Sequence, residues 1–309
     1  MRSVGRSVGR SVGLIDVDSH NFPNLALMKL SAWHKAQGDN VEWWNGLQHY
    51  DKVYMSKVFT DDYTPDMEFC INADEVVKGG TGYGLDNKLP EEIEHTFPDY
   101  ELYGIRDTAY GFLTRGCPRN CPFCITSKKD GRKSTKVADL SELWNGQDNI
   151  ELLDQNLLAC KEHEDLLIQL RDSGARVHDN GIDARFITTE NVELIQSVKW
   201  KGIHFAWDMM KDEQVVMNGL TLFRKNAKRR FSGRGYGIVY VLTNYNTTHE
   251  EDLYRVNLLR SMDFEPYIMI YDKPNAPQIT KHLQRYVNCR YIFYATTWNE
   301  YLKGRTRGS

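Results

Sequence analysis

The sequence predicts an α/β protein with two consecutive domains built on parallel strands. Two observations indicate this fold class. A strand–helix–strand pattern occupies residues 12–55, and after residue 109 the pattern changes to six repeated strand-then-helix units. A helix that connects two neighbouring strands of one sheet makes those strands parallel and covers the sheet. We therefore expect a first domain over residues 12–100 and a second domain over residues 101–303.

The first domain is expected to begin with a buried strand over residues 12–17. A polar turn follows, and a helix starts near Pro23, where apolar side chains begin to recur at helical spacing. Gly38 marks the end of this helix. Two further strands are expected at residues 41–44 and 51–55, which completes a β-α-β arrangement.

Glycines and prolines mark the remaining parts of this region. The glycine-rich residues 79–84 allow either a tight turn or a close approach of the backbone to a ligand or another loop. Residues 85–108 contain Pro90 and Pro98 and are expected to be a linker. Residues 1–11, where Arg-Ser-Val-Gly is repeated, and residues 304–309 are expected to be a disordered extension and a disordered tail.

The second domain is predicted from short apolar runs that alternate with helical patterns. Strands are expected at residues 110–115, 150–154, 175–179, 203–207, 236–242 and 267–271. Helices are expected at residues 162–173, 190–199, 211–230, 249–262 and 276–287. A last short strand over residues 291–294 and a helix over residues 297–303 complete the pattern. Six such units predict a parallel sheet with helices outside it.

Composition limits the class of protein. Hydrophobic residues make up 41% and charged residues 26% of the 309 residues, as in globular proteins, and no apolar run approaches the ~20 residues that cross a bilayer. The six cysteines and the lack of an N-terminal apolar segment favour a reducing cytoplasm without disulfides. The net charge of −3 does not favour nucleic acid as a partner. One basic cluster is either a solvated helix face or a docking patch for an anionic substrate: Arg224, Lys225, Lys228, Arg229, Arg230 and Arg234.

The most specific motif is a group of three cysteines with the spacing C-x-x-x-C-x-x-C: Cys117, Cys121 and Cys124. A cubic 4Fe–4S cluster has four iron corners, so three thiolates would leave one iron open to a small molecule. A zinc site would need a fourth ligand at paired spacing. Cys70, Cys160 and Cys289 are isolated, and no spacing recommends His163 or His178 for that role.

This loop resembles the signature of the radical S-adenosylmethionine enzymes, in which the open iron binds S-adenosylmethionine. The resemblance implies that the three cysteines hold a 4Fe–4S cluster. It also implies that S-adenosylmethionine is cleaved to methionine and a 5′-deoxyadenosyl radical, which abstracts hydrogen from a substrate. The family favours an aromatic residue before the third cysteine, and Phe123 stands there. The family fold implied for the second domain is a partial (β/α)6 barrel.

The first domain resembles the Rossmann-like domain of cobalamin-dependent relatives. Many such domains carry an Asp-x-His-x-x-Gly motif whose histidine binds cobalt. This sequence lacks that motif, and His20 in the first loop does not have its spacing. We therefore expect a degenerate cobalamin-binding-type domain, with cobalamin possible as a cofactor but not favoured.

Other expected contacts with S-adenosylmethionine follow the strands of the second domain, because ligands gather at the carboxyl ends of parallel strands. The resemblance implies contacts with the amino group, the carboxylate, the ribose and the adenine of that cofactor. In the string Gly-Ile-Asp-Ala-Arg, the arginine is suited to a bidentate pair with the carboxylate, or else forms a surface pair with the aspartate. The expected contact residues are Phe123, Asp154, Asn156, Asp183, Arg185, Trp207, Val241, Thr243 and Asn244.

The resulting hypothesis is a cytoplasmic radical S-adenosylmethionine enzyme whose net reaction the sequence does not specify. A small metabolite or a nucleotide is the favoured substrate, and a peptide or RNA comes next. An electron donor such as flavodoxin or ferredoxin is expected, and Lys128, Lys129, Arg132 and Lys133 after the loop are either solvated or recruit it. The alternative is a non-catalytic iron–sulfur or zinc protein that serves as a binding partner or sensor.

Overall fold

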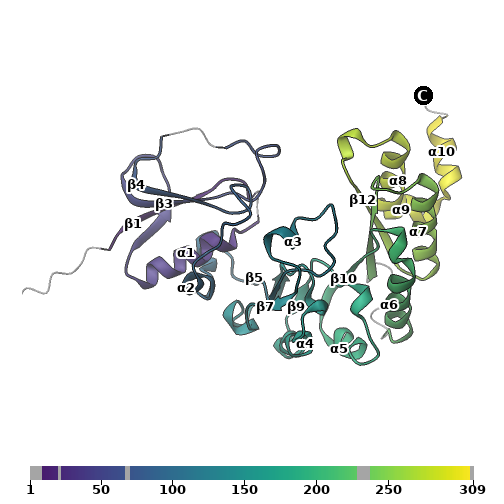
Figure 1. Cartoon of the computed structure of the whole chain (residues 1–309), viewed down its shortest axis with the longest axis horizontal. Coiled ribbons are helices and arrows are strands. Elements are labelled where there is room, and N and C mark those ends of the chain that lie inside the picture. Colours follow the sequence, from purple (N-terminus) through teal and green to yellow (C-terminus); the bar gives the residue numbers. More distant parts are fainter. Residues whose placement is uncertain (1–8, 20–21, 67–69, 228–236, 307–309) are drawn as a thin grey trace, which may run out of the picture.

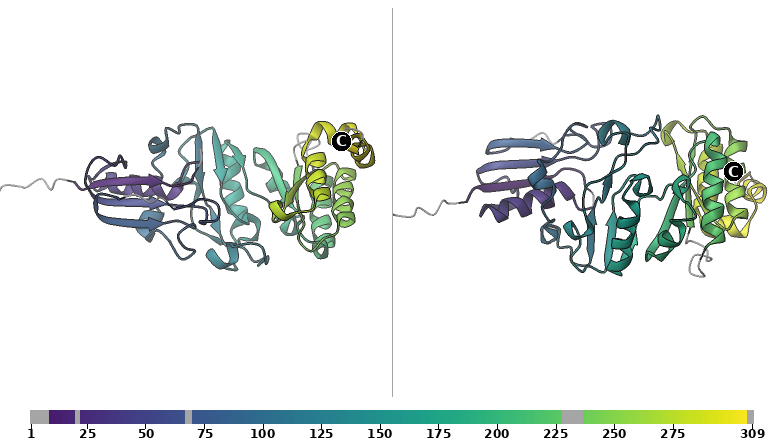
Figure 2. Two further views of the ribbon diagram at one scale, coloured as in Figure 1. Left: turned by 90° about the horizontal axis from the view of Figure 1, so that it is seen from above. Right: turned by 60° about the horizontal axis from the view of Figure 1, so that its bottom comes forward.

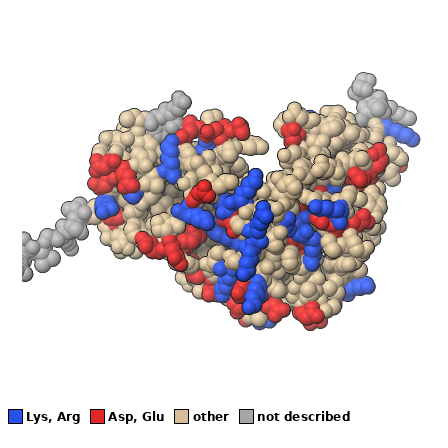
Figure 3. Space-filling view, viewed as in Figure 1, with Lys and Arg blue, Asp and Glu red and all other residues tan. Residues whose placement is uncertain are grey.

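A computed structural model describes residues 9–19, 22–66, 70–227 and 237–306 of the chain (Figure 1). Within these residues the strands form a four-stranded and a six-stranded parallel sheet, with a small two-stranded antiparallel sheet beside the larger one. The two large sheets follow one another along the long axis of the molecule in all views (Figures 1 and 2). Figure 3 shows a notch in the outline of the molecule, between the N-terminal half and the C-terminal strand–helix units.

The N-terminal sheet has the strand order β2-β1-β3-β4, and every neighbouring pair is parallel. Its elements are β1 (Ser11–Asp16), α1 (Leu25–Ala36), β2 (Asn40–Trp43), β3 (Tyr50–Ser56) and β4 (Ala73–Gly79). The predicted strand–helix–strand pattern is therefore confirmed. The central strand β1 carries four buried residues in succession, as expected of a strand covered on both faces. Asn24 caps α1, because its side chain accepts a hydrogen bond from the amide of Leu27.

The expected linker packs against both halves of the chain. It contains α2 (Glu91–Glu94) and the 3-10 helix η1 (Tyr100–Tyr103). Tyr100 is buried in the core of the large sheet together with Met28 of α1. The hydroxyl of Tyr103 donates to Asp16 at the end of β1, with an O···O distance of 2.5 Å. The boundary expected at residue 100 thus falls inside a packed segment.

The large sheet contains the six predicted strands in chain order, β12-β11-β10-β9-β8-β5, and all are parallel. They are β5 (Thr108–Gly111), β8 (Asn149–Leu152), β9 (Arg176–His178), β10 (Trp200–Ala206), β11 (Gly237–Thr243) and β12 (Glu265–Ile270). The helices are α4 (His163–Ser173), α5 (Val192–Ser197), α6 (Glu213–Lys225), α7 (His249–Ser261), α8 (Gln278–Asn288), α9 (Arg290–Ala295) and α10 (Trp298–Thr306). No helix in the described ranges has both the length and the apolar character that a membrane crossing requires.

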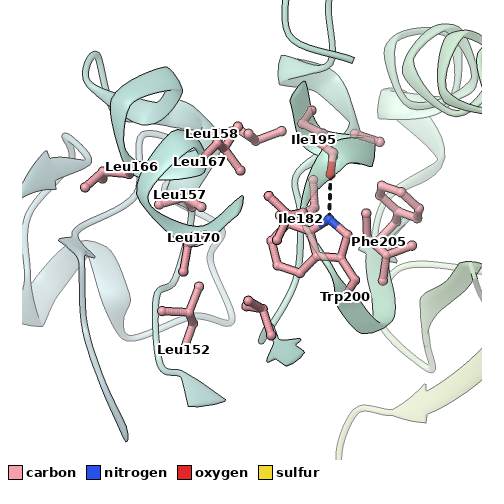
Figure 4. Close-up of a cluster of buried hydrophobic side chains, with 14 of the residues drawn as sticks. Leu152, Leu157, Leu158, Leu166, Leu167, Leu170, Ile182, Ile195, Trp200 and Phe205 are labelled. Carbon is pink, nitrogen blue, oxygen red and sulfur yellow. Dashed lines mark hydrogen bonds between the residues drawn. The ribbon is translucent and has the colours of Figure 1, made fainter. Parts of the chain in front are cut away.

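The two faces of the large sheet differ. In β11 buried residues alternate with partly exposed ones, which places one set of side chains against the helices and the other set on the opposite face. Figure 4 shows the helix side, where leucines of α4 pack near Leu152, and Trp200 and Phe205 lie beside Ile182. The indole of Trp200 donates to the carbonyl of Ile195 at 2.7 Å, so this buried nitrogen has a partner. The other face remains partly accessible.

Two expectations about single elements are wrong. The first strand of the large sheet ends at Gly111, because the amides of Leu113 and Thr114 turn away to donate to Asp154. The expected strand over residues 291–294 is helix α9, whose first turn is closed by hydrogen bonds from Ile292 and Phe293 to the carbonyl of Cys289. An aromatic run of four residues fits a strand or a buried helix equally well.

The ends of the chain also differ from expectation. Strand β1 starts at Ser11, inside the expected extension, and α10 continues to Thr306, inside the expected tail. Helix α6 ends at Lys225, and the guanidinium of Arg224 lies over the ring of Phe264 at 4.5 Å. The rest of the basic cluster lies outside the described residues: Lys228, Arg229, Arg230 and Arg234.

Gly219 lets α6 approach the segment that carries Asp183 and Arg185. A Cβ at this position would lie 1.7 Å from the carbonyl oxygen of Ala184, a backbone atom that cannot move alone. We expect Gly219→Ala to lower the free energy of unfolding by about 3 kcal/mol in urea denaturation, because overpacking displaces backbone. Gly304→Ala in α10 is the matched control, since nothing lies within 4 Å of its Cβ. Equal stability of the two variants would contradict this packing.

Candidate metal centre

The three cysteines lie in the loop that follows β5, at the carboxyl edge of the large sheet. Cys117, Cys121 and Cys124 are free thiols and are each partly buried. In the part of the chain that the structure describes, no three Cys, His, Asp or Glu side chains are arranged to hold a single metal ion. Thiolates of a cubic cluster bind separate irons and need not converge on one point. The donor set, three thiols in one loop, fits such a cluster.

Backbone contacts fix the start of the cysteine loop. Gly116 has φ of +90°, and a Cβ there would lie 2.2 Å from the carbonyl oxygen of Lys133. Only glycine combines this left-handed conformation with such a close approach. The side chain of Gln155, just after β8, accepts from the amide of Gly116 at 3.2 Å and donates to Asp130 at 2.9 Å. The loop therefore closes on itself and on the next strand.

Arg119, between the first two cysteines, ties the loop to the end of β10. Its guanidinium lies 3.5 Å from Asp208 and 3.0 Å from Asp212, and all three side chains are largely buried. Its Nε is buried and has no hydrogen-bond partner in the described part of the chain. Burial raises the pKa of the Asp208 carboxyl, and the charge of Arg119 partly opposes that shift. Burial also raises the pKa of the Cys121 thiol, again against the charge of Arg119.

Asn156, Asp183 and Arg185 form a chain of contacts that starts at Cys117. The amide nitrogen of Asn156 lies 3.5 Å from the sulfur of Cys117 and donates to Asp183 at 2.9 Å. Arg185 donates to both oxygens of Asp183, at 2.8 and 2.6 Å. Burial acts to raise the pKa of Asp183, but Arg185 and Arg119 outweigh it, and the pKa lies below its usual value. The structure thus brings these three predicted residues together, and Asp183 and Arg185 form a largely buried ion pair, not an exposed surface pair.

Phe123 connects the C-terminal part of the cysteine loop to the end of β11. Its ring meets that of Tyr245 edge-on at 5.1 Å, and Tyr245 meets Tyr271 after β12 at 4.9 Å. Asn244, beside Tyr245, has φ of +61° and donates to the carbonyl of Tyr271 at 2.8 Å. Asn244 therefore joins two loops, and the cysteine loop crosses the sheet edge from β5 to β11.

Asp154 is a structural anchor. Its carboxylate accepts from the amide of Leu113 and from both the amide and the hydroxyl of Thr114, at 2.5 to 2.9 Å. Burial raises its pKa to about 6, although these hydrogen bonds oppose the shift. Because its oxygens are engaged at the start of the cysteine loop, Asp154 shapes that loop and is not free to bind the amino group of a ligand as expected.

Three further expected contact residues do not face the site. Trp207, Val241 and Thr243 have no exposed surface and lie on the helix side of the sheet. The indole of Trp207 donates to the carbonyl of Met209 at 3.0 Å. The expectation that these side chains touch a cofactor is wrong, because alternation along the strands directs them toward the helices.

Sequence reasoning missed the ionic partners of this site. Asp208 and Asp212 follow β10, and Arg119 stands inside the motif, but long-range pairs leave no local pattern. Arg255 of α7 is fully buried and donates to the carbonyls of Trp207 and Leu242 at 2.8 and 2.7 Å. Two signals were present: an arginine between two cysteines, and acids four residues apart after a strand.

The glycine-rich segment after β4 serves a loop–loop contact. A Cβ at Gly80 would lie 2.3 Å from the carbonyl oxygen of Lys57, and a Cβ at Gly82 would lie 2.3 Å from that of Phe59. Lys57 is fully buried and pairs with Asp61. The buried Lys57 side chain and the backbone of the loop after β3 thus pack against the glycine-rich segment at the carboxyl edge of the small sheet. His20 lies outside the described residues.

The same glycine segment touches the cysteine loop. Lys129, in helix α3 (Thr126–Lys129), donates to the hydroxyl of Thr81, and burial lowers its pKa. Lys128, Arg132 and Lys133 are exposed around it. Lys and Arg side chains gather over the middle of the face in Figure 3, around the position that α3 has in Figure 1. The candidate zinc ligands form hydrogen bonds with other groups: His163 with the backbone carbonyl of Cys160, and His178 with the carboxylate of Glu151.

A hollow of about 380 Å³ lies at the opposite, amino edge of the large sheet, lined by residues such as Trp144, Arg176 and Lys199. It contains none of the residues that surround the cysteines. The convergent charged and thiol groups lie at the carboxyl edge, where parallel α/β folds bind their ligands. No protein-family model matches this chain, and no curated protein matches it as a relative.

Proposed function

We propose that the chain is a radical S-adenosylmethionine enzyme. One observation carries this proposal: a C-x-x-x-C-x-x-C loop follows the first strand of a six-stranded parallel sheet and crosses its carboxyl edge. Three thiols in one loop fit a 4Fe–4S cluster with one iron left open. The loop is attached at both sides, by Arg119 to the end of β10 and by Phe123 to the end of β11.

Cys117, Cys121 and Cys124 would hold the cluster, and S-adenosylmethionine would lie next to Asp183 and Arg185. When bound, the cluster and S-adenosylmethionine would supply a one-electron reduction and a 5′-deoxyadenosyl radical. Asp183 orients Arg185 through two hydrogen bonds, and this largely buried arginine would pair with the carboxylate of the ligand. Asn156 joins this pair to the cysteine loop. These residues bind and orient, while the cofactors carry the difficult chemistry.

The finer fold assignment belongs to the same proposal. Strand order that follows the chain without reversal, and a loop after β5 that reaches β10 and β11, support a partial (β/α)6 barrel. The small parallel sheet supports a Rossmann-like domain. The close packing of its glycine-rich segment on the loop after β3 supports a degenerate cobalamin-binding-type domain that no longer holds cobalamin. A cytoplasmic location, a small-molecule or nucleotide substrate and an acidic electron donor such as flavodoxin or ferredoxin complete the proposal.

Anaerobic reconstitution of the full chain with iron and sulfide tests this function. We expect about four irons per chain and an electron paramagnetic resonance signal that changes when S-adenosylmethionine is added. With dithionite, 5′-deoxyadenosine should form even without the true substrate. A cluster that ignores S-adenosylmethionine would favour a non-catalytic iron–sulfur protein, and stoichiometric zinc without iron would favour a zinc module. Either result would overturn the proposal.

A further inference from the structure

A continuous row of polar and aromatic side chains crosses the open face of the large sheet. Its rings touch in sequence: His178 meets His204 at 5.2 Å, His204 stacks on Tyr240 at 5.5 Å with an interplanar angle of 6°, and Tyr240 meets Tyr267 at 5.7 Å. These four residues come from four neighbouring strands, β9 to β12. Tyr110 of β5 begins the row at the other edge of the sheet, next to Glu151 of β8.

Each histidine in this row is held by a carboxylate. The Nδ1 of His178 lies 2.5 Å from Glu151, and the Nδ1 of His204 lies 3.1 Å from Asp179. A carboxylate that accepts a hydrogen bond from Nδ1–H fixes the orientation of the ring and leaves Nε2 available to accept a hydrogen bond from a ligand. Neither Nε2 has a partner among the described residues. The second oxygen of Asp179 is buried and has no hydrogen-bond partner among the described residues, so His204 is the contact that the structure shows for this carboxylate.

The tyrosine hydroxyls of the row are free as well. In the described parts of the chain, no hydrogen bond engages the hydroxyl of Tyr110, Tyr240 or Tyr267, and Tyr267 is 41% exposed. The row therefore offers phenol donors, imidazole nitrogens and flat ring faces on one surface. Leaving partly buried polar groups of this kind without hydrogen bonds costs free energy, and a bound molecule or water would supply those hydrogen bonds.

The charges on the row select among ligands. The row contains the carboxylates of Glu151 and Asp179, and Lys201 is a cation whose charge acts on His178, so a phosphate or carboxylate group would meet an excess of negative charge. An apolar molecule would displace water from the phenols and imidazoles without replacing the hydrogen bonds that the water makes. An uncharged ring with neighbouring hydroxyl groups satisfies both conditions, because each hydroxyl both donates and accepts and the ring packs on aromatic faces.

We propose that this row, through the Nε2 atoms of His178 and His204 and the hydroxyl of Tyr240, binds an uncharged ring that carries a vicinal diol. This names the substrate class of the proposed enzyme, and it rests on the proposed function because it places the substrate on one face of the sheet whose carboxyl edge carries the cysteine loop. The diol has two natural sources, the ribose of a nucleoside and a free sugar.

The test uses three probes and the full chain, first without iron and then after reconstitution. The probes are uridine, 2′,3′-dideoxyuridine and methyl glucoside, each at about 1 mM. The readout is the Cε1–H resonance of the labelled histidines, of which the chain has nine. We expect uridine or methyl glucoside to shift the resonances of His178 and His204, with dideoxyuridine without effect. Which of the two binds identifies the source.

Tyr240→Phe removes one hydroxyl and keeps the ring stack. We expect it to weaken binding about fivefold to tenfold, as for one lost hydrogen bond. Tyr291→Phe is the matched control, since that residue is 91% exposed on α9 and should bind as the unchanged chain does. Equal binding of dideoxyuridine, no shift with any probe, or no effect of Tyr240→Phe would overturn the inference. Probe binding by a chain that takes up no cluster on reconstitution would overturn only the proposed function, and a cluster without probe binding would overturn only this inference.

Discussion

Serine in place of Cys117, Cys121 or Cys124 is expected to abolish both the bound iron and the formation of 5′-deoxyadenosine. Each thiolate would hold one iron corner, and three protein ligands leave none in reserve. Serine keeps the size of the side chain but is a poor ligand for these irons. The measurements are iron content after anaerobic reconstitution and 5′-deoxyadenosine released with dithionite, for each single variant.

Cys289→Ser is the matched control for these variants. This cysteine is partly buried like the three loop cysteines, but it caps α8 and begins α9 far along the chain. It should keep full iron and full activity. If one of the three loop variants also kept both, the cluster would not depend on the loop, and the assignment of the cysteines would fail.

Truncation of Arg255 is expected to be the most destabilising change to the support of the site. The guanidinium is fully buried and donates to Asp252 at 2.6 Å as well as to the carbonyls that end β10 and β11. Arg255→Ala would leave the buried carboxylate of Asp252 unpaired, which costs about 3–5 kcal/mol. The loss should appear as a lower midpoint of urea denaturation with an unchanged slope.

A surface pair provides the comparison for Arg255. Arg171 pairs with Asp172 at 2.7 Å, but both side chains are well exposed. Arg171→Ala should change the free energy of unfolding by less than about 1 kcal/mol. Similar losses for the two variants would show that burial does not determine the contribution of Arg255. Because Arg255 holds the carbonyl of Trp207, next to Asp208, we also expect Arg255→Ala to loosen the contact between Asp208 and Arg119.

Most strands and helices were predictable because they depend on local patterns. The short apolar runs of the large sheet are buried between helices and a partly covered face, so each run stood out between polar turns. Gly174 ends α4 in the left-handed conformation, with φ of +66°, as the sequence indicated. The run at residues 291–294 failed, because four aromatic and apolar residues carry no decisive period.

The site was predictable only in part. The strand predicted before the cysteines placed their loop at the end of β5, and the structure brings Asn156, Asp183 and Arg185 close to that loop. The side that a strand residue faces could not be read where both faces carry apolar residues, which is why Val241 and Trp207 were assigned wrongly. Ion pairs such as Arg119 with Asp212 join residues 93 positions apart, and no local pattern records them.

The attachment of the cysteine loop orders events during biosynthesis. The three thiols leave the ribosome early, but Asp208, Asp212 and Tyr245, which hold Arg119 and Phe123, are synthesised much later. Contacts between such distant positions form slowly, since a long stretch of chain must first be brought back. A nascent chain that stops before Tyr245 therefore exposes the thiols before all the contacts that hold the cysteine loop can form. In the proposed enzyme, iron delivery would best follow completion of the last third of the polypeptide, when the three thiols are already held in place.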